Sequence, residues 1–299
     1  MRIKTYIQEQ NSCAGLTNRL LSKYVNRIFT AYDGMEKFFP KDKTLNLGNP
    51  VRKSLKIDRV SKKESRNFFG LKEDVFTVLV VGGSLGAEPI NAVICHILDD
   101  MQASMSECIR ADYGDGTFKP NYTQLIWQTG ESKFNFYKEK FGEEGFVSIH
   151  KFINRMDLAY HAADIVISRA GAIAISEICF LSKASILIPS PYVTDNHQLI
   201  NARYLEKYNG CLILEEDASV AHPLTLFSSL TFFARVFSLE SFTFPDIEGL
   251  DLINDQPRLD GFPEMHSKDI REKIGRNANQ LFKYNAAEEI ASIVLKEIK

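Results

Sequence analysis

The stretch Val78-Leu79-Val80-Val81-Gly82-Gly83-Ser84-Leu85-Gly86-Ala87 joins a short apolar run to a glycine-rich turn. An apolar, β-branched run of this kind is typical of a strand that is covered on both faces, as in a parallel sheet between helices. A glycine-rich turn between a strand and a helix offers backbone N–H groups and the positive end of the helix dipole, which together favour phosphate. The stretch therefore predicts an α/β domain with a candidate anion-binding turn.

Six apolar runs recur along the chain from residue 76 onward. They span residues 76–81, 124–127, 146–149, 164–168, 185–189 and 211–214. The segments between them have helical periodicity, and this alternation is typical of βαβ units. We expect a Rossmann-like, doubly wound domain built on a parallel sheet.

Helix-end signals and interruptions refine this prediction. Asp195 is placed to N-cap a helix over residues 196–209, and Gly210 follows where a left-handed C-terminal residue is favoured. Residues 279–299 carry alanines and isoleucines on one face and predict a single C-terminal helix. Two stretches, 108–121 and 238–267, break the pattern and predict surface insertions.

The first 52 residues carry too few apolar side chains to form an independent core. Their pattern predicts a strand at residues 5–7, a helix at 16–24 and a second strand at 27–31. We therefore expect this segment to depend on a missing segment or on the C-terminal domain.

Composition narrows the class of protein. The 299 residues have a net charge of -2 and so lack the strong overall excess of Lys and Arg typical of general nucleic-acid binding, which leaves only a local basic patch open. The five cysteines are odd in number and lack paired CxxC spacing, so we interpret them as reduced structural thiols rather than a zinc or redox site. No apolar run approaches the ~20 residues of a membrane span, so any membrane contact is expected to be peripheral.

The turn from Gly82 to Ala87 has three interpretations on its motif alone. It is consistent with a phosphate cradle, with a plain tight turn, and with the Gly-x-Ser-x-Gly elbow of an α/β-hydrolase whose nucleophile would be Ser84. The hydrolase needs an acid and a histidine downstream. His197 and His222 are available, but nothing in their neighbourhoods marks either as a catalytic base.

A second glycine turn, Ser168-Arg169-Ala170-Gly171-Ala172, again follows an apolar run and opens a helix that carries Ser176 and Glu177. A carboxylate one turn beyond a phosphate-binding loop is placed to accept hydrogen bonds from both ribose hydroxyls. A solvated helix glutamate explains Glu177 equally well.

A third polar cluster lies at Asp195-Asn196-His197-Gln198-Leu199-Ile200-Asn201-Ala202. Gln198 and Asn201 are three residues apart, so they share a helical face from which amides could bind sugar hydroxyls. N-capping and ordinary surface polarity are the alternative explanation.

Together these stretches resemble the MurG family, the glycosyltransferases that add N-acetylglucosamine to lipid I to make lipid II. Besides the three motifs above, the matching residues are Gln8-Glu9-Gln10-Asn11, Ala14-Gly15-Leu16-Thr17-Asn18, Gly48-Asn49-Pro50-Val51-Arg52 and Phe152-Ile153. The motifs stand in the family's order over residues 8 to 202. The resemblance implies a GT-B fold, with two Rossmann-like domains of which the second holds UDP-N-acetylglucosamine.

The resemblance also implies which residues bind substrate. Carried over position by position, they are Asn11, Arg52, Ser84, Ile153, Ala172, Ile173, Ala174, Ile175, Ser176, Glu177 and Gln198. Asn11 would contact the sugar, and Arg52 and Ser84 would lie near the diphosphate. The backbone of Ile153 would contact the uracil.

The remaining implied roles belong to two helices. The helix over residues 172–177 would cover the nucleotide, with Glu177 on the ribose. Gln198 would bind the sugar hydroxyls, with Asn201 beside it. Ala174 stands where the family commonly has threonine, which removes one hydroxyl near the phosphates but leaves the helix dipole intact.

The implied reaction is an inverting transfer that needs neither a metal nor a cofactor, because helix ends and backbone donors stabilise the leaving UDP. The implied partners are UDP-N-acetylglucosamine and lipid I. The implied location is the cytoplasmic face of the plasma membrane, as a peripheral protein.

One part of the family has no match in this sequence. The family's first glycine-rich loop, which carries a histidine, and a second segment facing the acceptor precede the matched residues, so no catalytic base is assigned here. We expect residues 1–52 to be a remnant of the acceptor domain with the hinge, 53–275 the nucleotide-sugar domain and 276–299 a C-terminal helix. The alternative function is an inactive or split-chain UDP-sugar-binding remnant, whose partner chain would supply the missing half.

Overall fold

The computed structural model describes residues 3–55, 60–110, 123–216, 265 and 267–298, without the side chains of residues 100 and 103–110. The chain divides into two compact parts. The first part comprises Met1–Asp58, Ser168–Glu215 and Glu272–Lys299, and the second comprises Arg59–Ile167 and Glu216–Arg271. Most of the two predicted insertions lies outside the described residues.

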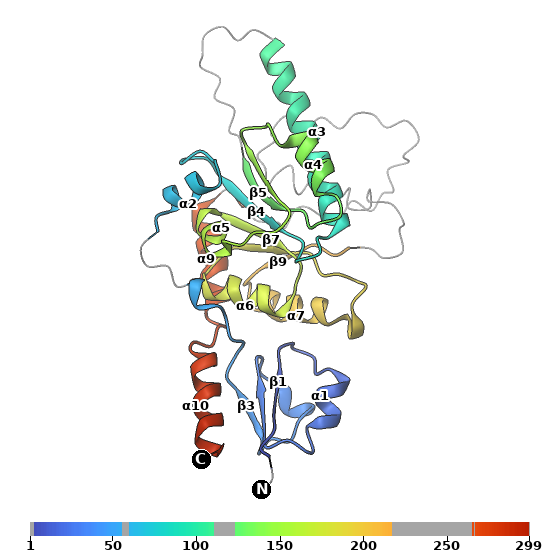
Figure 1. Ribbon diagram of the computed structural model, residues 1–299, viewed down its shortest axis with the longest axis vertical. Coiled ribbons are helices and arrows are strands. Elements are labelled where there is room, and N and C mark those ends of the chain that lie inside the picture. Colours follow the sequence, from blue (N-terminus) through green and yellow to red (C-terminus); the bar gives the residue numbers. More distant parts are fainter. Residues whose placement is uncertain (1–2, 56–59, 111–122, 217–264, 266, 299) are drawn as a thin grey trace. The chain divides into compact units, whose positions relative to one another are not determined.

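The first part contains a three-stranded parallel sheet (Figure 1). Its strands are β1 (Tyr6–Glu9), β2 (Arg27–Thr30) and β3 (Thr44–Asn46), in the order β1-β2-β3. The predicted strands at 5–7 and 27–31 are confirmed with small shifts of their ends. The strand β3 was not predicted, because three residues with one apolar side chain give no periodic signal.

A second sheet has six strands in the order β6-β5-β4-β7-β8-β9. They are β4 (Thr77–Val81), β5 (Gln124–Gln128), β6 (Val147–His150), β7 (Ile165–Ser168), β8 (Ser185–Leu187) and β9 (Leu212–Ile213). Each predicted run coincides with one of these strands, although β5 and β6 each extend one residue beyond the predicted run, and the paired strands β4, β5 and β6 run parallel. The prediction of an α/β fold with a parallel sheet is confirmed.

The second part contains four described helices, of which α4 packs on a buried tryptophan of the sheet. They are α2 (Lys62–Phe68), α3 (Glu88–Arg110), α4 (Phe134–Phe141) and α5 (Met156–Ala162). Trp127 on β5 is fully buried, and its ring lies 4.6 Å from that of Tyr137 and 6.5 Å from that of Phe141, both on α4. This packing holds β5 against α4 near the carboxyl end of the strand.

The remaining helices include the two that carry predicted site residues. The α-helices are α1 (Leu16–Leu21), α6 (Ala172–Phe180), α7 (His197–Glu206), α9 (Lys268–Asn279) and α10 (Ala286–Ile298), with 3-10 helices η1 (Met35–Lys37), η2 (Lys53–Leu55) and η3 (Thr194–Asn196). In the first part, α10 runs alongside the three-stranded sheet (Figure 1), where Glu297 accepts hydrogen bonds from Arg27 Nε at 2.6 Å and from the Tyr6 hydroxyl at 3.3 Å. The C-terminal helix therefore supports the N-terminal strands.

Two predictions about the ends of α7 are wrong. Asp195 does not N-cap α7: it has a left-handed φ of 55°, and the N-cap is Asn196 without a side-chain cap hydrogen bond. The left-handed residue after α7 is Asn209 (φ 54°) rather than Gly210. Gly210 is instead needed for space, since an added Cβ would lie 3.1 Å from Ala278 Cα.

The predicted helix over residues 279–299 is also wrong in its extent. α9 ends at Asn279, α10 begins at Ala286, and the residues between them form a turn that contains a left-handed Asn285. A left-handed asparagine interrupts a helix, because its backbone direction cannot continue the i to i+4 ladder.

Candidate functional site

The glycine turn after β4 has the backbone geometry of an anion cradle. Gly83 and Gly86 have φ of 92° and 82°, and the Gly86 N–H donates to the Gly83 carbonyl at 3.1 Å. Ser84 and Leu85 form the exposed tip. Within the described residues, their backbone N–H groups have no hydrogen-bond acceptor. The turn therefore presents two free donors to solvent.

Residues at the carboxyl end of β5 hold the turn in place. The Gln128 amide donates from Nε2 to the Gly83 carbonyl at 2.9 Å, and its Oε1 accepts from the Ile153 N–H at 2.8 Å. An added Cβ at Gly86 would lie 2.1 Å from the Thr129 carbonyl oxygen, so this position admits only glycine. Close packing therefore fixes the turn before any ligand arrives.

A second buried amide completes this support. Asn91 on α3 donates to the Thr129 carbonyl at 2.8 Å and accepts from the Trp127 indole N–H at 3.0 Å. Asn91 is 2% exposed, and Trp127 is fully buried. Neither Asn91 nor Gln128 was predicted as a site residue, because their contacts arise between segments far apart in sequence.

Ile153, the predicted uracil contact, lies in the loop after β6 and is 2% exposed. Its N–H is used by Gln128, whereas its carbonyl has no hydrogen-bond donor among the described residues. The Ile153 N–H is therefore used within the protein, and its carbonyl has no hydrogen-bond partner among the described residues.

The second glycine turn opens α6 in the first part of the chain. Gly171 is the N-cap, and it has an extended backbone and no side-chain cap; the first turn contains no acidic residue. Within the described residues, the N–H groups of Ala172, Ile173 and Ala174 donate to no acceptor. Free N–H groups and the helix dipole give this end a positive character.

The carboxylate of Glu177 lies one turn further along α6, and its side chain is 5% exposed. It accepts a hydrogen bond from Arg52 Nε at 2.7 Å, whereas the Arg52 side chain is 47% exposed. Two residues predicted from separate motifs thus meet. The reading of Glu177 as a solvated helix glutamate is excluded by its burial.

Ser176, the residue before Glu177, binds Asn49 in the segment that precedes Arg52. Ser176 Oγ accepts from Asn49 Nδ2 at 3.1 Å and donates to the Ala172 carbonyl at 2.8 Å. Asn49 also donates to the Gln10 carbonyl at 3.0 Å, and it is 3% exposed. These contacts tie the segment before Arg52 to α6.

Asn11 and Asn201 face each other in the first part. Asn201 Nδ2 donates to Asn11 Oδ1 at 3.0 Å, and Asn201 Oδ1 accepts from the Ser12 N–H and from its hydroxyl, both at 2.9 Å. Asn201 is fully buried. The expectation that Asn201 lies open beside Gln198 for a sugar is therefore wrong, because its amide holds the loop at Asn11.

The side chain of Gln198 is partly exposed, whereas that of Asn201 is fully buried. Its Oε1 accepts from the Ser190 N–H at 2.9 Å, and its side-chain NH₂ group has no acceptor among the described residues. The amide is thus oriented by one hydrogen bond while its donor remains available.

Glu9 organises the loop that carries Asn11, a role that the sequence analysis missed. Its carboxylate accepts from the N–H groups of Asn11 and Gly15, both at 3.0 Å, and from Asn18 Nδ2 at 2.9 Å. Glu9 is 3% exposed. A buried carboxylate that accepts several N–H donors fixes its loop in one conformation.

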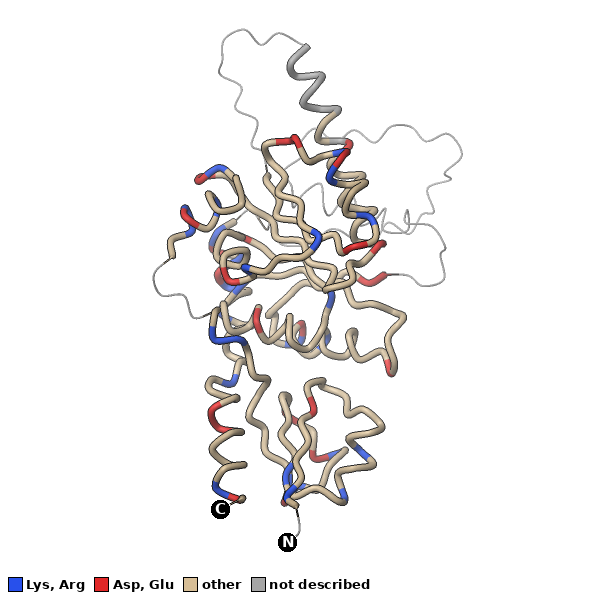
Figure 2. Tube along the Cα trace, in the orientation of Figure 1, with Lys and Arg blue, Asp and Glu red and all other residues tan. Residues whose placement is uncertain are grey.

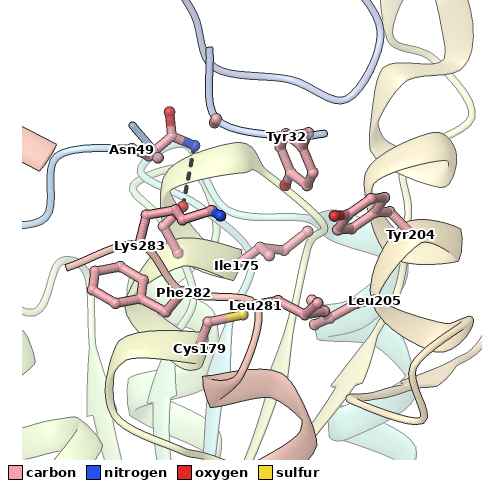
Figure 3. A pocket seen from close by; sticks show the side chains of 12 residues that line it. Tyr32, Asn49, Ile175, Cys179, Tyr204, Leu205, Leu281, Phe282 and Lys283 are labelled. Carbon is pink, nitrogen blue, oxygen red and sulfur yellow. Dashed lines mark hydrogen bonds between the residues drawn. The ribbon is translucent and has the colours of Figure 1, made fainter. Parts of the chain in front are cut away.

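A small pocket lies in the first part, beside α6 and α7 (Figure 3). Its lining includes Tyr32, Asn49, Ile175, Cys179 and Lys283. The Tyr32 hydroxyl points into it and has no hydrogen-bond partner, and burial raises the pKa of this hydroxyl. Burial likewise raises the pKa of the Cys179 thiol to about 12, so the thiol is protonated at neutral pH.

The hydrolase interpretation of Ser84 finds no support in its surroundings. No side chain in the described part of the chain hydrogen-bonds to Ser84, and His197 Nδ1 instead lies 2.8 Å from the Thr194 carbonyl. His222 lies outside the described residues. The geometry of a nucleophile with its base is therefore absent from these residues.

Charged residues of both signs are interspersed along both parts (Figure 2). Among the residues that the structure covers, no cluster of His, Cys, Asp and Glu is arranged to hold a metal ion. No described helix is both long and apolar enough to cross a membrane. Cys13, Cys95, Cys179 and Cys211 are free thiols, and Cys179 and Cys211 are buried.

The chain is similar to known glycosyltransferases. Residues 77–231 match the glycosyltransferase family 28 C-terminal domain. The UDP-N-acetylglucosamine–N-acetylmuramyl-(pentapeptide) pyrophosphoryl-undecaprenol N-acetylglucosamine transferase of Phocaeicola vulgatus is 43% identical over 222 residues, which are 73% of this chain and 54% of the relative. The protein of the same name from Parabacteroides distasonis is 46% identical over 219 residues, which are 72% of this chain and 55% of the relative.

The fold matches a solved structure of the same group. The crystal structure of Acinetobacter baumannii MurG superposes with a TM-score of 0.61 at 21% identity, covering 98% of this chain and 67% of that chain. The chain spans about half the length of the curated relatives it matches. Because the family model covers just over half of the chain, the chain belongs to glycosyltransferase family 28, and the predicted relationship to the MurG transferases is confirmed.

Proposed function

We propose that the chain binds UDP-N-acetylglucosamine and that, with an acceptor-binding half, it transfers N-acetylglucosamine to lipid I to form lipid II. The names of its relatives support the donor and the peptidoglycan acceptor. Under this proposal the chain has three segments. Residues 1–52 belong to the acceptor domain and hinge, residues 53–275 form the nucleotide-sugar domain, and residues 276–299 form the C-terminal helical segment. The protein would act as a peripheral protein at the inner face of the plasma membrane, where the lipid-linked acceptor lies.

The observation that carries this proposal is the pair of glycine turns with free N–H groups. One turn offers the donors of Ser84 and Leu85, and the other offers the first N–H groups of α6. Backbone donors at a strand-to-helix turn suit the oxygens of a diphosphate, because each N–H exchanges a hydrogen bond to water for one to a charged oxygen.

The buried Glu177 supports a nucleotide rather than a simple diphosphate. A carboxylate accepts hydrogen bonds from two neighbouring hydroxyls, one to each oxygen, and the ribose of a nucleotide supplies such a pair. Arg52 Nε lies against this carboxylate, and the other guanidinium N–H groups have no acceptor among the described residues. Arg52 can therefore neutralise Glu177 while its outer N–H groups contact a phosphate.

The sugar is assigned to Asn11 and Gln198. Both amides lie in the first part and each is oriented by a hydrogen bond within the protein, Asn11 by Asn201 and Gln198 by Ser190. Oriented amides bind hydroxyls with less loss of side-chain entropy than free ones do. The N-acetylglucosamine identity rests on the relatives alone.

In the proposed reaction the acceptor hydroxyl oxygen attacks the anomeric carbon of the sugar. The bond from that carbon to the β-phosphate oxygen breaks, UDP leaves with the electron pair, and the hydroxyl proton passes to a base. Free N–H donors such as those at the start of α6 stabilise the charge that develops on the leaving diphosphate, because preorganised donors need no rearrangement during the reaction. We propose no base among residues 1–299.

The alternative function is a UDP-sugar-binding chain that is inactive alone or that works with a partner chain. The chain matches about half the length of these relatives. Transfer of labelled N-acetylglucosamine to lipid I by the purified chain alone would exclude it.

Isothermal titration with UDP and UDP-N-acetylglucosamine tests the binding proposal. We expect the wild-type chain to bind both ligands, and Glu177→Gln to lose at least about tenfold in affinity, the usual effect of removing a charged hydrogen-bond acceptor. Glu297→Gln is the matched control, because it neutralises another ion-paired carboxylate of the same part. Folded wild-type protein that releases no heat with either ligand would refute the proposal.

A further inference from the structure

One face of α7 contacts the loops that follow the N-terminal strands. Asn201 holds the loop after β1 through its hydrogen bonds with Asn11 and Ser12. One turn further along α7, the Tyr204 hydroxyl donates to Asp33 Oδ2, in the loop after β2, at 3.3 Å. Residues three apart share a helical face, so both contacts lie on one side of α7. The helix is therefore held at two places, and the proposed function gives a role to only one of them.

The contact at Tyr204 combines an aromatic pair with a hydrogen bond. The rings of Tyr204 and Tyr32 lie edge to face, with centroids 4.9 Å apart and an interplanar angle of 88° (Figure 3). Tyr32 is 6% exposed, so Tyr204 packs on a buried side chain. Burial and the charge of Asp33 raise the pKa of Tyr204 to about 12. The Tyr204 hydroxyl therefore keeps its proton at neutral pH and donates it to the carboxylate.

Asp33 is oriented by a second donor. Its Oδ1 accepts from Asn46 Nδ2 on β3, while its Oδ2 accepts from Tyr204. Each carboxylate oxygen thus has one partner, and the donor on β3 fixes the direction in which Asp33 faces Tyr204. The pair therefore links α7 to β3 as well as to the loop after β2.

The start of α7 has little support from its own cap. Asn196, the N-cap, makes no side-chain cap hydrogen bond, and both Asn196 and Asp195 have left-handed backbones. Because α7 has only ten residues, its contacts near the other end also determine where its first turn lies. Gln198, to which the proposed function assigns the sugar, lies on that first turn.

We infer that Tyr204 is a positioning residue for the donor sugar, which holds α7, and with it the Gln198 amide, against Asp33. The inference rests on the proposed function for the assignment of the sugar to Gln198. A loosened α7 lowers the fraction of molecules in which Gln198 is in place, and the apparent affinity for the sugar falls with that fraction. UDP alone makes no use of Gln198 in this assignment, so its affinity is independent of Tyr204.

Four substitutions separate this hydrogen bond from general packing. Tyr204→Phe removes the hydroxyl and keeps the ring on Tyr32, and Asp33→Ala removes the acceptor. Asp33→Asn keeps one acceptor oxygen for Tyr204 and offers a donor to Asn46 Oδ1, which has no hydrogen-bond partner. Tyr208→Phe is the matched control: the Tyr208 ring lies 5.5 Å from that of Tyr204, and its hydroxyl has no partner among the described residues.

The measurement is the affinity of each variant for UDP-N-acetylglucosamine and for UDP by isothermal titration, together with its unfolding by urea. Tyr204→Phe and Asp33→Ala should each weaken UDP-N-acetylglucosamine about threefold, the size of a weak hydrogen bond, and leave UDP unchanged. The double variant should lose no more than either single variant, because both changes remove the same contact. Asp33→Asn and Tyr208→Phe should keep both affinities.

The outcomes distinguish this inference from the proposed function. Wild-type protein that binds neither ligand would refute both. A Tyr204→Phe variant with an unchanged ratio of the two affinities would refute only the role of Tyr204, and equal weakening of both ligands would assign it a general structural role and overturn the inference. A Gln198→Ala variant that keeps the ratio would refute the action of Tyr204 through Gln198.

Discussion

Arg52 Nε lies 2.7 Å from Glu177 Oε1, so the carboxylate predicted for the ribose already carries an ion pair from the chain itself. The pair is uneven, because the Glu177 side chain is 5% exposed and that of Arg52 is 47% exposed. A buried carboxylate that loses its cation is left with uncompensated charge. Arg52 therefore contributes to the fold as well as to the proposed phosphate contact.

A double-mutant cycle of Arg52→Met and Glu177→Gln should show this coupling. We expect a coupling energy of about 1–2 kcal/mol in the free energy of unfolding, which is below the value for fully buried pairs because solvent screens Arg52. Urea unfolding of the four proteins gives the coupling. Additive effects of the two changes would show that the pair does not stabilise the fold.

Asn201 and Gln198 should respond differently to substitution, although they lie on one turn of α7. Asn201→Ala should cost about 2–3 kcal/mol in the free energy of unfolding, because it leaves the Ser12 N–H and the Asn11 amide without buried partners. Gln198→Ala should cost less than about 1 kcal/mol, because its side chain makes one hydrogen bond at a partly exposed site. Thermal and urea unfolding check both values, and equal losses would contradict the assignment.

The glycine turn supplies a matched pair of substitutions. Gly86→Ala would place a Cβ 2.1 Å from the Thr129 carbonyl oxygen, so we expect a loss of more than about 3 kcal/mol. Gly83→Ala meets no atom within 4 Å, so only its left-handed φ should cost, at about 1 kcal/mol. Chemical denaturation of the two variants measures the difference. A Gly86→Ala variant as stable as Gly83→Ala would show that the turn is not held against β5.

Asp164 should govern part of the acid stability. Burial alone would raise the pKa of this carboxyl, but hydrogen bonds from Lys62 and the Thr77 N–H and the charge of Arg66 together hold the pKa below its ordinary value of 3.8. A lowered folded pKa means that the carboxylate stabilises the fold above about pH 4 and that this contribution is lost as the pH falls further.

Asp164→Asn should therefore be less stable than the wild type at pH 7, by about 3 kcal/mol, because it leaves the buried Arg66 without its anion. The difference should shrink below about pH 4, where the wild-type carboxyl takes up its proton. Urea unfolding across this pH range gives the comparison. A constant difference at every pH would show that Asp164 does not titrate with unfolding.

The strands of the larger sheet could be predicted from the sequence, because each is a short run of apolar residues buried on both faces. Val78, Leu79 and Val80, for example, are fully buried. The start of α7 could not be predicted in this way. Asp195 and Asn196 have the local chemistry of N-caps, but both adopt left-handed backbones, which asparagine and aspartate tolerate better than most residues.

The candidate site was predictable in its backbone motifs and not in its side-chain partners. The two glycine turns and Glu177 follow from local spacing. The Arg52–Glu177 pair, the buried Asn201 and the Gln128 bridge each join segments remote in sequence, so no local pattern encodes them. The role expected for Asn201 also changed once its burial was known. Helical spacing places Asn201 and Gln198 on one face, but it does not reveal which of the two side chains faces solvent.

The pairing of β5 with its neighbours has a consequence for evolution and design. Val81 pairs with Gln128, and Gln128 pairs with His150, so the bridging amide is presented only in this alignment. Since side chains alternate between the faces of a strand, a shift by one position would bring Trp127 or Thr129 to that place. An insertion or deletion near the far end of β5 would therefore remove the support of the glycine turn without altering any residue of the turn itself.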